Sequence, residues 1–130
     1  MMKAFAAHGA RCKVLLVEDD EAALAMYATT LRMEGFHIRT ARDGVTALRI
    51  LESFEPDVVI LDLKLPLASG FEVLHDLRAT SLRMPVIAVS GHEPGIEQAK
   101  RDPDFFAALR KPFDPGDLIA ITRRAASYQS

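Results

Sequence analysis

Residues 14–20 read Val-Leu-Leu-Val-Glu-Asp-Asp, a short apolar run that stops at three acidic residues. Three later segments repeat this arrangement of an apolar run followed at once by polar residues. Short apolar runs separated by longer amphipathic segments are typical of a parallel sheet that helices cover on both faces, so the pattern predicts an α/β fold. The later segments are Val58–Leu61 before Asp62, Val86–Val89 before Ser90, and Phe106–Leu109 before Arg110, Lys111 and Pro112.

The polar residues that follow these runs are expected to meet at one edge of the sheet. The carboxyl ends of parallel strands share an edge, and open α/β sheets bind ligands in the crevice outside it. The residues brought together would be three or four carboxylates, a hydroxyl and a lysine. Such a set suits a divalent cation and a phosphoryl group.

The segment after the first run carries the signals of a helix. Glu21–Glu34 has an apolar stripe at helical spacing that includes Leu24, Tyr27 and Leu31. Gly35 follows as a residue suited to a left-handed helix stop. We therefore expect the first helix to pack this stripe against the sheet.

A second helix is expected over Val45–Ser53, with Asp43 as its N-cap and Val45, Leu48, Ile50 and Leu51 facing inward. The other elements follow from alternating polarity and from turn residues. They are an edge strand over Phe36–Ala41, a strand over Asp57–Leu61, a loop over Leu63–Gly70, a third helix over Phe71–Ala79 and a strand from Pro85.

Prolines limit the fourth helix and start the fifth. Pro94 and Pro103 bracket Gly95–Asp102, which leaves room for about two turns, so we expect this helix to be the most mobile element. Asp114 and Pro115 form a cap and a first helical position for a last helix that reaches about Ala126. The alternation of strands and helices is then (βα)5.

The composition excludes several classes of protein. A chain of 130 residues, 49% apolar and 26% charged, forms one globular domain, and its formal net charge of −2 gives no basic surface for direct nucleic-acid binding. The single Cys12 excludes an internal disulfide and a cysteine-built zinc site, and it fits a reducing compartment. No apolar run approaches the ~20 residues that span a bilayer, and no secretion signal is visible, so we expect a cytoplasmic protein that does not bind membranes.

Four separated motifs make the chain resemble the receiver domain of two-component response regulators. The resemblance covers nearly all of residues 13–126, and the agreement in order and spacing is what makes it specific. The motifs are Val-Glu-Asp-Asp at 17–20, Leu-Asp-Leu-Lys-Leu-Pro at 61–66 followed by Gly70, Val-Ser-Gly at 89–91, and Lys-Pro-Phe at 111–113.

The resemblance implies a doubly wound, flavodoxin-like three-layer sandwich with a parallel sheet in the order 2-1-3-4-5. The receiver domain would occupy residues 12–127, between a flexible N-terminal tail over 1–11 and a C-terminal end over 128–130.

The resemblance makes Asp62 the phosphoacceptor, whose carboxylate takes a phosphoryl group from the histidine of a partner and forms a mixed anhydride. It implies Mg²⁺ as the cofactor, held by Glu18, Asp19, Asp62 and the backbone carbonyl of Lys64, because small hard cations take oxygen ligands. We expect Asp20 to cap the first helix instead of contacting the metal directly.

Two further residues complete the implied site. Lys111 would bind the phosphoryl oxygens as a point charge, aimed inward by a cis bond to Pro112. Ser90 would offer its hydroxyl to the new phosphoryl group and pull its loop inward. Arg110 should point to the opposite side of its strand as a solvated charge.

Lys64 and His92 flank the path that hydrolytic water must take to the acceptor. Our hypothesis is that these bulky side chains slow hydrolysis of the phosphoprotein, against the alternative that both are solvated loop residues. His8, His37 and His75 have no partner at catalytic or metal-ligand spacing, and we interpret them as structural or surface residues.

The chain departs from the family pattern three residues before Lys111, where Ala108 replaces the usual Tyr or Phe. That aromatic side chain swings inward and reports phosphorylation to the outer face. Phe105 or Phe106 would have to serve instead, but core packing is the favoured role of both.

The leading hypothesis is a stand-alone receiver that acts as a phosphorylation-controlled binding module and catalyses only its own phosphorylation and dephosphorylation. The alternatives are a docking-only pseudo-receiver and the receiver fragment of a longer regulator or hybrid kinase. A haloacid-dehalogenase-type phosphatase would need an Asp where Lys64 stands, and a nucleotide-binding protein would need a glycine-rich loop after the first strand.

The implied partner is a histidine kinase or a histidine phosphotransfer protein. By resemblance it would dock on the first helix, where Ala22, Ala23 and Met26 are candidate contacts. The chain itself is expected to be a monomer or weak dimer, and its downstream target is unknown.

Overall fold

A computed structural model of the chain describes residues 11–80 and 82–128. The expected receiver domain over 12–127 lies almost wholly within these ranges, whereas the expected N-terminal tail falls outside them except for Arg11. In the described ranges, no helix is long and apolar enough to cross a membrane.

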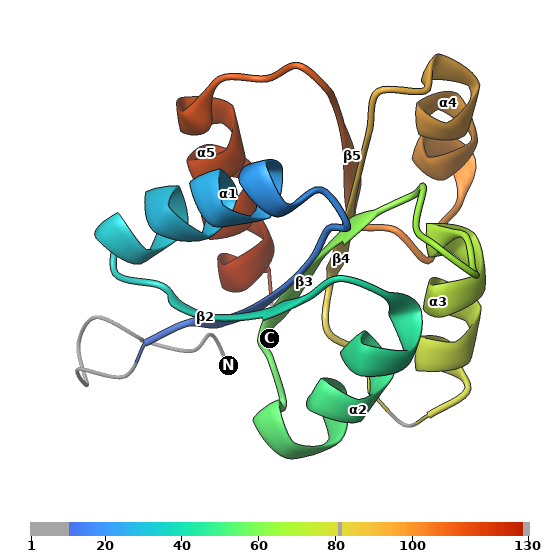
Figure 1. The fold of residues 1–130 in the computed structure, drawn as a ribbon, viewed down its shortest axis with the longest axis horizontal. Coiled ribbons are helices and arrows are strands. Elements are labelled where there is room, and N and C mark those ends of the chain that lie inside the picture. Colours follow the sequence, from blue (N-terminus) through green and yellow to red (C-terminus); the bar gives the residue numbers. More distant parts are fainter. Residues whose placement is uncertain (1–10, 81, 129–130) are drawn as a thin grey trace.

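The core of the fold is a parallel sheet of five strands in the order β2-β1-β3-β4-β5 (Figure 1). The order 2-1-3-4-5 and the flavodoxin-like α/β architecture confirm the predicted fold class. The bounds are β1 (Lys13–Val17), β2 (His37–Ala41), β3 (Val58–Asp62), β4 (Val86–Ser90) and β5 (Ala107–Arg110).

The central strands β3 and β4 are buried at every position, and β1 is buried after Lys13. Strands buried on both faces need continuous apolar runs, which is why Val14–Val17 and Val86–Val89 do not alternate in polarity. The edge strand β2 does alternate, with exposed His37 and Arg39 on either side of buried Ile38.

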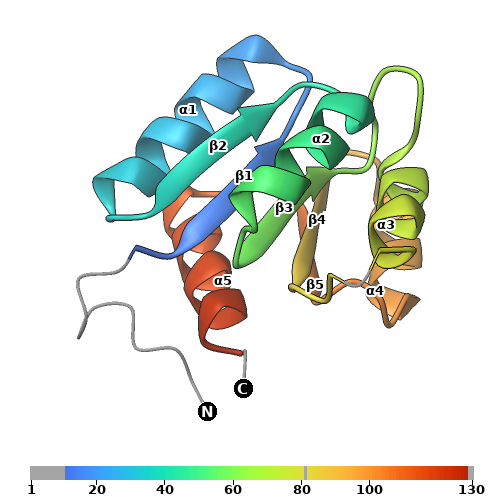
Figure 2. The ribbon, with the colours of Figure 1, turned by 90° about the horizontal axis from the view of Figure 1, so that it is seen from below.

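Five helices cover the two faces of the sheet (Figure 2). Helices α1 (Glu21–Met33) and α5 (Pro115–Ser127) bury their apolar stripes against one face, where Leu24, Leu31 and Leu118 belong to one core cluster. The other face carries the second cluster, beneath α2 (Gly44–Phe54), α3 (Gly70–Arg78) and α4 (Glu93–Arg101).

Several helix boundaries follow the predicted capping residues. The Asp20 carboxylate accepts a hydrogen bond from the Ala23 amide at 2.8 Å, and Asp43 accepts one from the Thr46 amide at 2.8 Å. Gly35 has φ 95°, the left-handed conformation expected after α1.

Two details of the helices differ from the sequence prediction. Val45 is 62% exposed, so its predicted inward orientation is wrong: α2 begins at Gly44, and the core-facing stripe runs through Gly44, Ala47, Leu51 and Phe54. Helix α4 begins at Glu93, not at Gly95, and so includes Pro94 in its first turn. A proline is tolerated there because the N–H groups of the first turn have no partner within the helix, so the missing N–H of proline costs nothing. The predicted mobility of α4 stays a prediction.

The loop between β3 and α3 closes tightly against the end of β3. The Gly70 amide donates to the Leu63 carbonyl at 2.8 Å, and a Cβ at position 70 would lie 2.6 Å from the Asp62 carbonyl oxygen. Only glycine allows this approach. At the tip of the loop, Leu67 has φ 71° and is 96% exposed.

Candidate functional site

Three carboxylates meet at the carboxyl edge of the sheet. Glu18 follows β1 and Asp62 ends β3, and the β1–β3 register pairs Val17 with Leu61, so these two acidic residues stand on adjacent strands. Glu18 is 1% exposed and Asp62 is 4% exposed. One carboxylate oxygen from each of Glu18, Asp19 and Asp62 lies within 4.8 Å of the others.

Lys111 neutralises part of this charge. Its Nζ donates to Glu18 Oε1 at 2.6 Å and to Asp62 Oδ2 at 2.9 Å. Its amide donates to the Ser90 carbonyl at 2.9 Å, which ties the backbone after β5 to the end of β4. Burial alone would lower the pKa of Lys111, but the hydrogen bonds with Glu18 and Asp62 outweigh it and raise that pKa, so the ammonium stays charged.

The other oxygens of the two buried carboxylates accept backbone hydrogen bonds. Asp62 Oδ1 accepts from the Lys64 amide at 2.8 Å, and Glu18 Oε2 accepts from the Asp20 amide at 3.1 Å. Burial raises the pKa of Glu18, and the hydrogen bond from Lys111 opposes that rise. Both side chains are therefore fixed in place by donors on two sides.

Ser90 ends β4 beside this group and is 3% exposed. Its Oγ accepts a hydrogen bond from the His92 amide at 3.0 Å. Because the oxygen is the acceptor in this contact, the hydroxyl hydrogen is available for another partner.

A cleft of about 660 Å³ opens over these residues. The predicted site residues Asp62, Ser90 and Lys111 all line it, which brings together side chains from three strand ends as the topology predicted. The other lining residues are Glu18, Asp19, Asp20, Lys64, Leu65, Pro66, Gly91 and His92.

The donor set fits a small hard cation. All the candidate side-chain ligands are carboxylate oxygens, the ligand type that Mg²⁺ prefers. Two of them, on Glu18 and Asp62, are buried beside a single lysine, so the cluster has net negative charge to offset. Lys64 contacts Asp62 through its amide, and the predicted metal contact of its carbonyl stays a prediction.

The residues with no predicted direct role in the chemistry make other contacts, although Asp20 also lines the cleft. Arg110 pairs with Glu93 at 3.7 Å on the surface, and Asp20 caps α1. His37 packs edge-on against Phe54, with ring centroids 5.3 Å apart, and His75 is exposed. His8 lies outside the described residues. The peptide bond between Lys111 and Pro112 is cis, as predicted.

The aromatic residues near Ala108 are engaged in packing. Phe105 is buried and meets Phe71 edge-on at 5.6 Å, and Phe106 meets Tyr128 at 5.0 Å. Neither therefore replaces the missing aromatic residue at position 108 in this structure.

One residue near the site was identified from the sequence only as part of the α1 stripe. Tyr27 is 8% exposed and stacks on Phe113, with ring centroids 5.2 Å apart. The sequence places the two residues 86 positions apart, so only the fold brings them together. The one signal in the sequence was that the apolar stripe of the first helix includes an aromatic residue, Tyr27.

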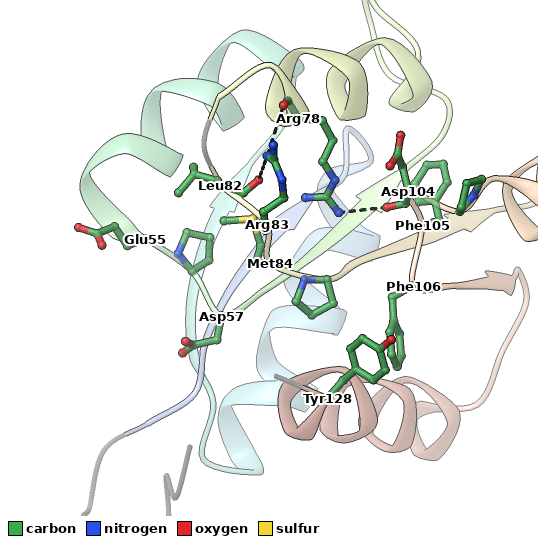
Figure 3. Close-up of a pocket in the computed structure, with 13 residues that line it drawn as sticks. Glu55, Asp57, Arg78, Leu82, Arg83, Met84, Asp104, Phe105, Phe106 and Tyr128 are labelled. Carbon is green, nitrogen blue, oxygen red and sulfur yellow. Dashed lines mark hydrogen bonds between the residues drawn. The ribbon is translucent and has the colours of Figure 1, made fainter. Parts of the chain in front are cut away.

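A second, larger cavity of about 740 Å³ lies at the opposite edge of the sheet (Figure 3). Its two arginines bind backbone carbonyls: Arg78 Nη2 donates to that of Asp104 at 3.0 Å, and Arg83 Nη1 donates to that of Leu82 at 2.8 Å. Arg78 Nη1 is fully buried and has no partner among the described residues. Among the described residues, this cavity has no counterpart of the lysine that pairs with two carboxylates in the cleft.

Comparison with known proteins is consistent with this geometry. A family model described as the response regulator receiver domain matches residues 14–123. The regulatory protein AtoC of Escherichia coli is 31% identical over 91% of this chain and 26% of its own length. The cell cycle response regulator CtrA of Brucella ovis is 35% identical over 89% of this chain and 52% of its length. The chain thus spans about half or less of these relatives.

Solved structures of response regulator receivers also resemble this chain, and the likeness covers nearly their whole length. The chemotaxis response regulator CheY4 of Vibrio cholerae has a TM-score of 0.80 and 28% identity, covering 88% of this chain and 98% of that one. A CheY-like receiver domain from Methylobacillus flagellatus has a TM-score of 0.77 and 29% identity, covering 89% of this chain and 99% of the other.

Proposed function

This chain belongs to the family of response regulator receiver domains, and from that premise we propose that Asp62 accepts a phosphoryl group from a phosphohistidine of a partner protein. The partner would be a histidine kinase or a histidine phosphotransfer protein of a two-component system. The proposal rests above all on one observation: Asp62 is a buried carboxylate held between the Lys64 amide and the Lys111 ammonium at the mouth of a cleft.

The arrangement orients the nucleophile. Hydrogen bonds from the Lys64 amide and from Lys111 hold the two carboxylate oxygens of Asp62 in place. One of its oxygens attacks phosphorus as the P–N bond to histidine breaks. The imidazole nitrogen keeps the electron pair of that bond and takes a proton from solvent. The product is an acyl phosphate on Asp62.

Glu18, Asp19 and Asp62, with the carbonyl of Lys64, would hold Mg²⁺. Bound there, the ion supplies positive charge that offsets the carboxylates and the incoming phosphoryl oxygens. Without such charge, the carboxylates repel an anionic phosphoryl donor.

Two side chains would hold the phosphoryl group after transfer. The Lys111 ammonium, which binds Asp62 Oδ2 in this structure, follows the negative charge onto a phosphoryl oxygen. The Ser90 hydroxyl, whose hydrogen is available, donates to another. The loop that carries Ser90 and His92 would then move inward, which is the change that a binding partner reads.

We propose a phosphorylation-controlled binding module that acts only on itself and is not an enzyme for other substrates. The same chemistry holds for a free-standing receiver and for the receiver part of a longer regulator. The length of the curated relatives supports the second arrangement.

Intact mass after incubation with acetyl phosphate and Mg²⁺ tests the proposal. We expect one phosphoryl addition that disappears in Asp62→Asn and in a metal-free control. Absence of both phosphorylation and Mg²⁺ binding would replace the proposal with a docking-only pseudo-receiver.

A further inference from the structure

The proposed chemistry gives no role to the stacked rings of Tyr27 and Phe113. The two ring planes are inclined by 28° with their centroids 5.2 Å apart. Tyr27 comes from α1 and is buried, whereas Phe113 lies in the segment between β5 and α5 and is half-buried.

The stack adjoins the segment that carries the phosphate-binding lysine. Phe113 is two residues beyond Lys111 in the chain. The charges of Lys111, Glu18 and Asp62 all act on the Tyr27 phenol, whose pKa is raised chiefly by burial and is lowered again in part by Lys111. The ring of Tyr27 is therefore close enough to the site to sense its charge.

The segment from Lys111 to α5 is fastened at both ends. The Lys111 amide binds the Ser90 carbonyl at 2.9 Å, and the Asp114 amide binds the Asp117 carboxylate at 3.3 Å, at the start of α5. Between these points, the Phe113 ring stacks on α1. The stack is thus placed to fix where the Lys111 backbone stands relative to α1.

The stack also lies on a defined side of the sheet. Tyr27, Phe113 and Leu109 belong to the core beneath α1 and α5, whereas Ala108 packs in the core of the opposite face. Position 108 and the Tyr27–Phe113 stack therefore lie on opposite faces of the sheet.

We propose that Tyr27 is a positioning residue: its ring holds Phe113 and thereby aims Lys111 at Asp62, and it registers the movement of Lys111 when the phosphoryl group binds. The inference rests on the proposed function, because that function has Lys111 bind Asp62 before phosphorylation and a phosphoryl oxygen after it. It assigns the conformational response to the α1 and α5 side of the sheet, through aromatic packing and not through position 108.

Substitutions separate the ring from the hydroxyl. We expect Tyr27→Leu to slow acetyl phosphate labelling by about tenfold or more, since small displacements of a charged group strongly reduce rate. Tyr27→Phe keeps the ring and should label at the wild-type rate. Tyr128→Leu is the matched control, because it removes the Phe106–Tyr128 pair at the far edge of the sheet and should leave labelling unchanged (Figure 3).

Tyrosine fluorescence gives a second readout that does not depend on a folded Tyr27→Leu protein. The chain has no tryptophan and two tyrosines, so Tyr128→Phe leaves Tyr27 as the sole emitter at tyrosine wavelengths. We expect its emission to change when Mg²⁺ and beryllofluoride, an analogue of the phosphoryl group, are added. Tyr27→Phe, which retains only Tyr128, should show no change.

The outcomes distinguish the inference from the function beneath it. Suppose that Asp62 is labelled normally in the wild type. Unchanged Tyr27 emission on addition of Mg²⁺ and beryllofluoride, or a wild-type labelling rate in Tyr27→Leu, would then overturn the inference and leave the proposed function intact. Slow labelling in Tyr27→Phe as well as in Tyr27→Leu would also overturn it, because the hydroxyl and not the stacked ring would then matter. Absence of Asp62 labelling in the wild type would overturn both.

Discussion

Both edges of the sheet carry charged side chains that make hydrogen bonds, but the partners of these bonds differ. At the carboxyl edge, Lys111 binds two side chains, Glu18 and Asp62. At the opposite edge, cationic side chains bind backbone carbonyls: Lys13 donates to the Phe54 carbonyl at 2.9 Å, and Arg83 donates to that of Leu82. An incoming anion can replace a carboxylate as the partner of Lys111. The contacts at the opposite edge, the fastened edge, hold segments of the backbone together.

The difference shows why cavity size is a poor guide to function in this protein. The larger cavity lies at the fastened edge, where charged groups complete hydrogen bonds that the backbone would otherwise lack. The smaller cleft has mutually paired side chains on separate strands. A phosphoryl group can take one partner of such a pair without unfolding anything.

Removal of one half-buried cation at each edge should give the largest contrast in labelling. We expect Lys111→Met to reduce acetyl phosphate labelling by about 100-fold, because it removes a charged donor from the reacting group. Arg78→Met should leave labelling unchanged but should lower the free energy of unfolding by about 1–3 kcal/mol, since the Asp104 carbonyl would lose the hydrogen bond that Arg78 Nη2 donates at 3.0 Å. Labelling rates and urea unfolding measure both effects. Equal loss of labelling in the two variants would break the comparison.

A carboxylate at the fastened edge should matter for folding and not for chemistry. Asp57 is 4% exposed and accepts a hydrogen bond from the Lys13 amide at 2.9 Å. We expect Asp57→Ala to lower the free energy of unfolding by about 1–3 kcal/mol, the usual effect of leaving a buried donor unpaired. Urea denaturation measures the loss, and mass labelling of the folded variant should remain complete. A variant that folds but does not label would place Asp57 in the site.

The exposed rim of the cleft should affect the lifetime of the phosphoprotein by a smaller factor. Lys64 and His92 both line the cleft and both are exposed. We expect Lys64→Ala and His92→Ala each to speed hydrolysis of phosphorylated Asp62 a few-fold, because water gains access to phosphorus. Decay of the phosphorylated mass after removal of the donor measures this. Unchanged decay would make both residues ordinary solvated side chains.

The smallest effect should be on stability and should come from Asp43, the N-cap of α2. Hydrogen bonds from the Thr46 amide and then from its hydroxyl lower the pKa of Asp43, the N-cap of α2. A lowered pKa in the folded state means that the ionised carboxylate stabilises the fold above its unfolded pKa, and that this stabilisation disappears as the pH falls through the folded pKa. We expect the urea midpoint of wild type to exceed that of Asp43→Ala at neutral pH and the gap to narrow in acid. A gap that stays constant with pH would assign the effect to helix propensity.

The sequence was most informative where one interaction dominates. Apolar runs bounded by Asp62 and Ser90 predicted the sheet and the edge at which the site forms, because central parallel strands have few alternatives. Capping by Asp20 and Asp43 was predictable for the same reason, as each is decided within a few residues. Val45 was wrong because the buried stripe of α2 passes through Gly44 and Ala47, which are small and give a weaker apolar signal than Val45.

Contacts between distant segments were less accessible to sequence reasoning. The two-carboxylate pairing of Lys111 and the stacking of Tyr27 on Phe113 depend on how α1 and the segment after β5 approach each other. No local pattern specifies that approach. The family resemblance indicated the role of Lys111 but was silent on Tyr27.

The contact of Gly70 with the end of β3 also bears on how this protein could diversify. A side chain at position 70 would press on the backbone of Asp62 itself, so changes there cannot be tolerated without displacing the acceptor. The exposed Leu67, three residues earlier in the same loop, has no such constraint from packing. The sequence could therefore change at the tip of this loop over generations while its base stays glycine, and a mutational scan of the loop would show this as a steep gradient of tolerance from Leu67 to Gly70.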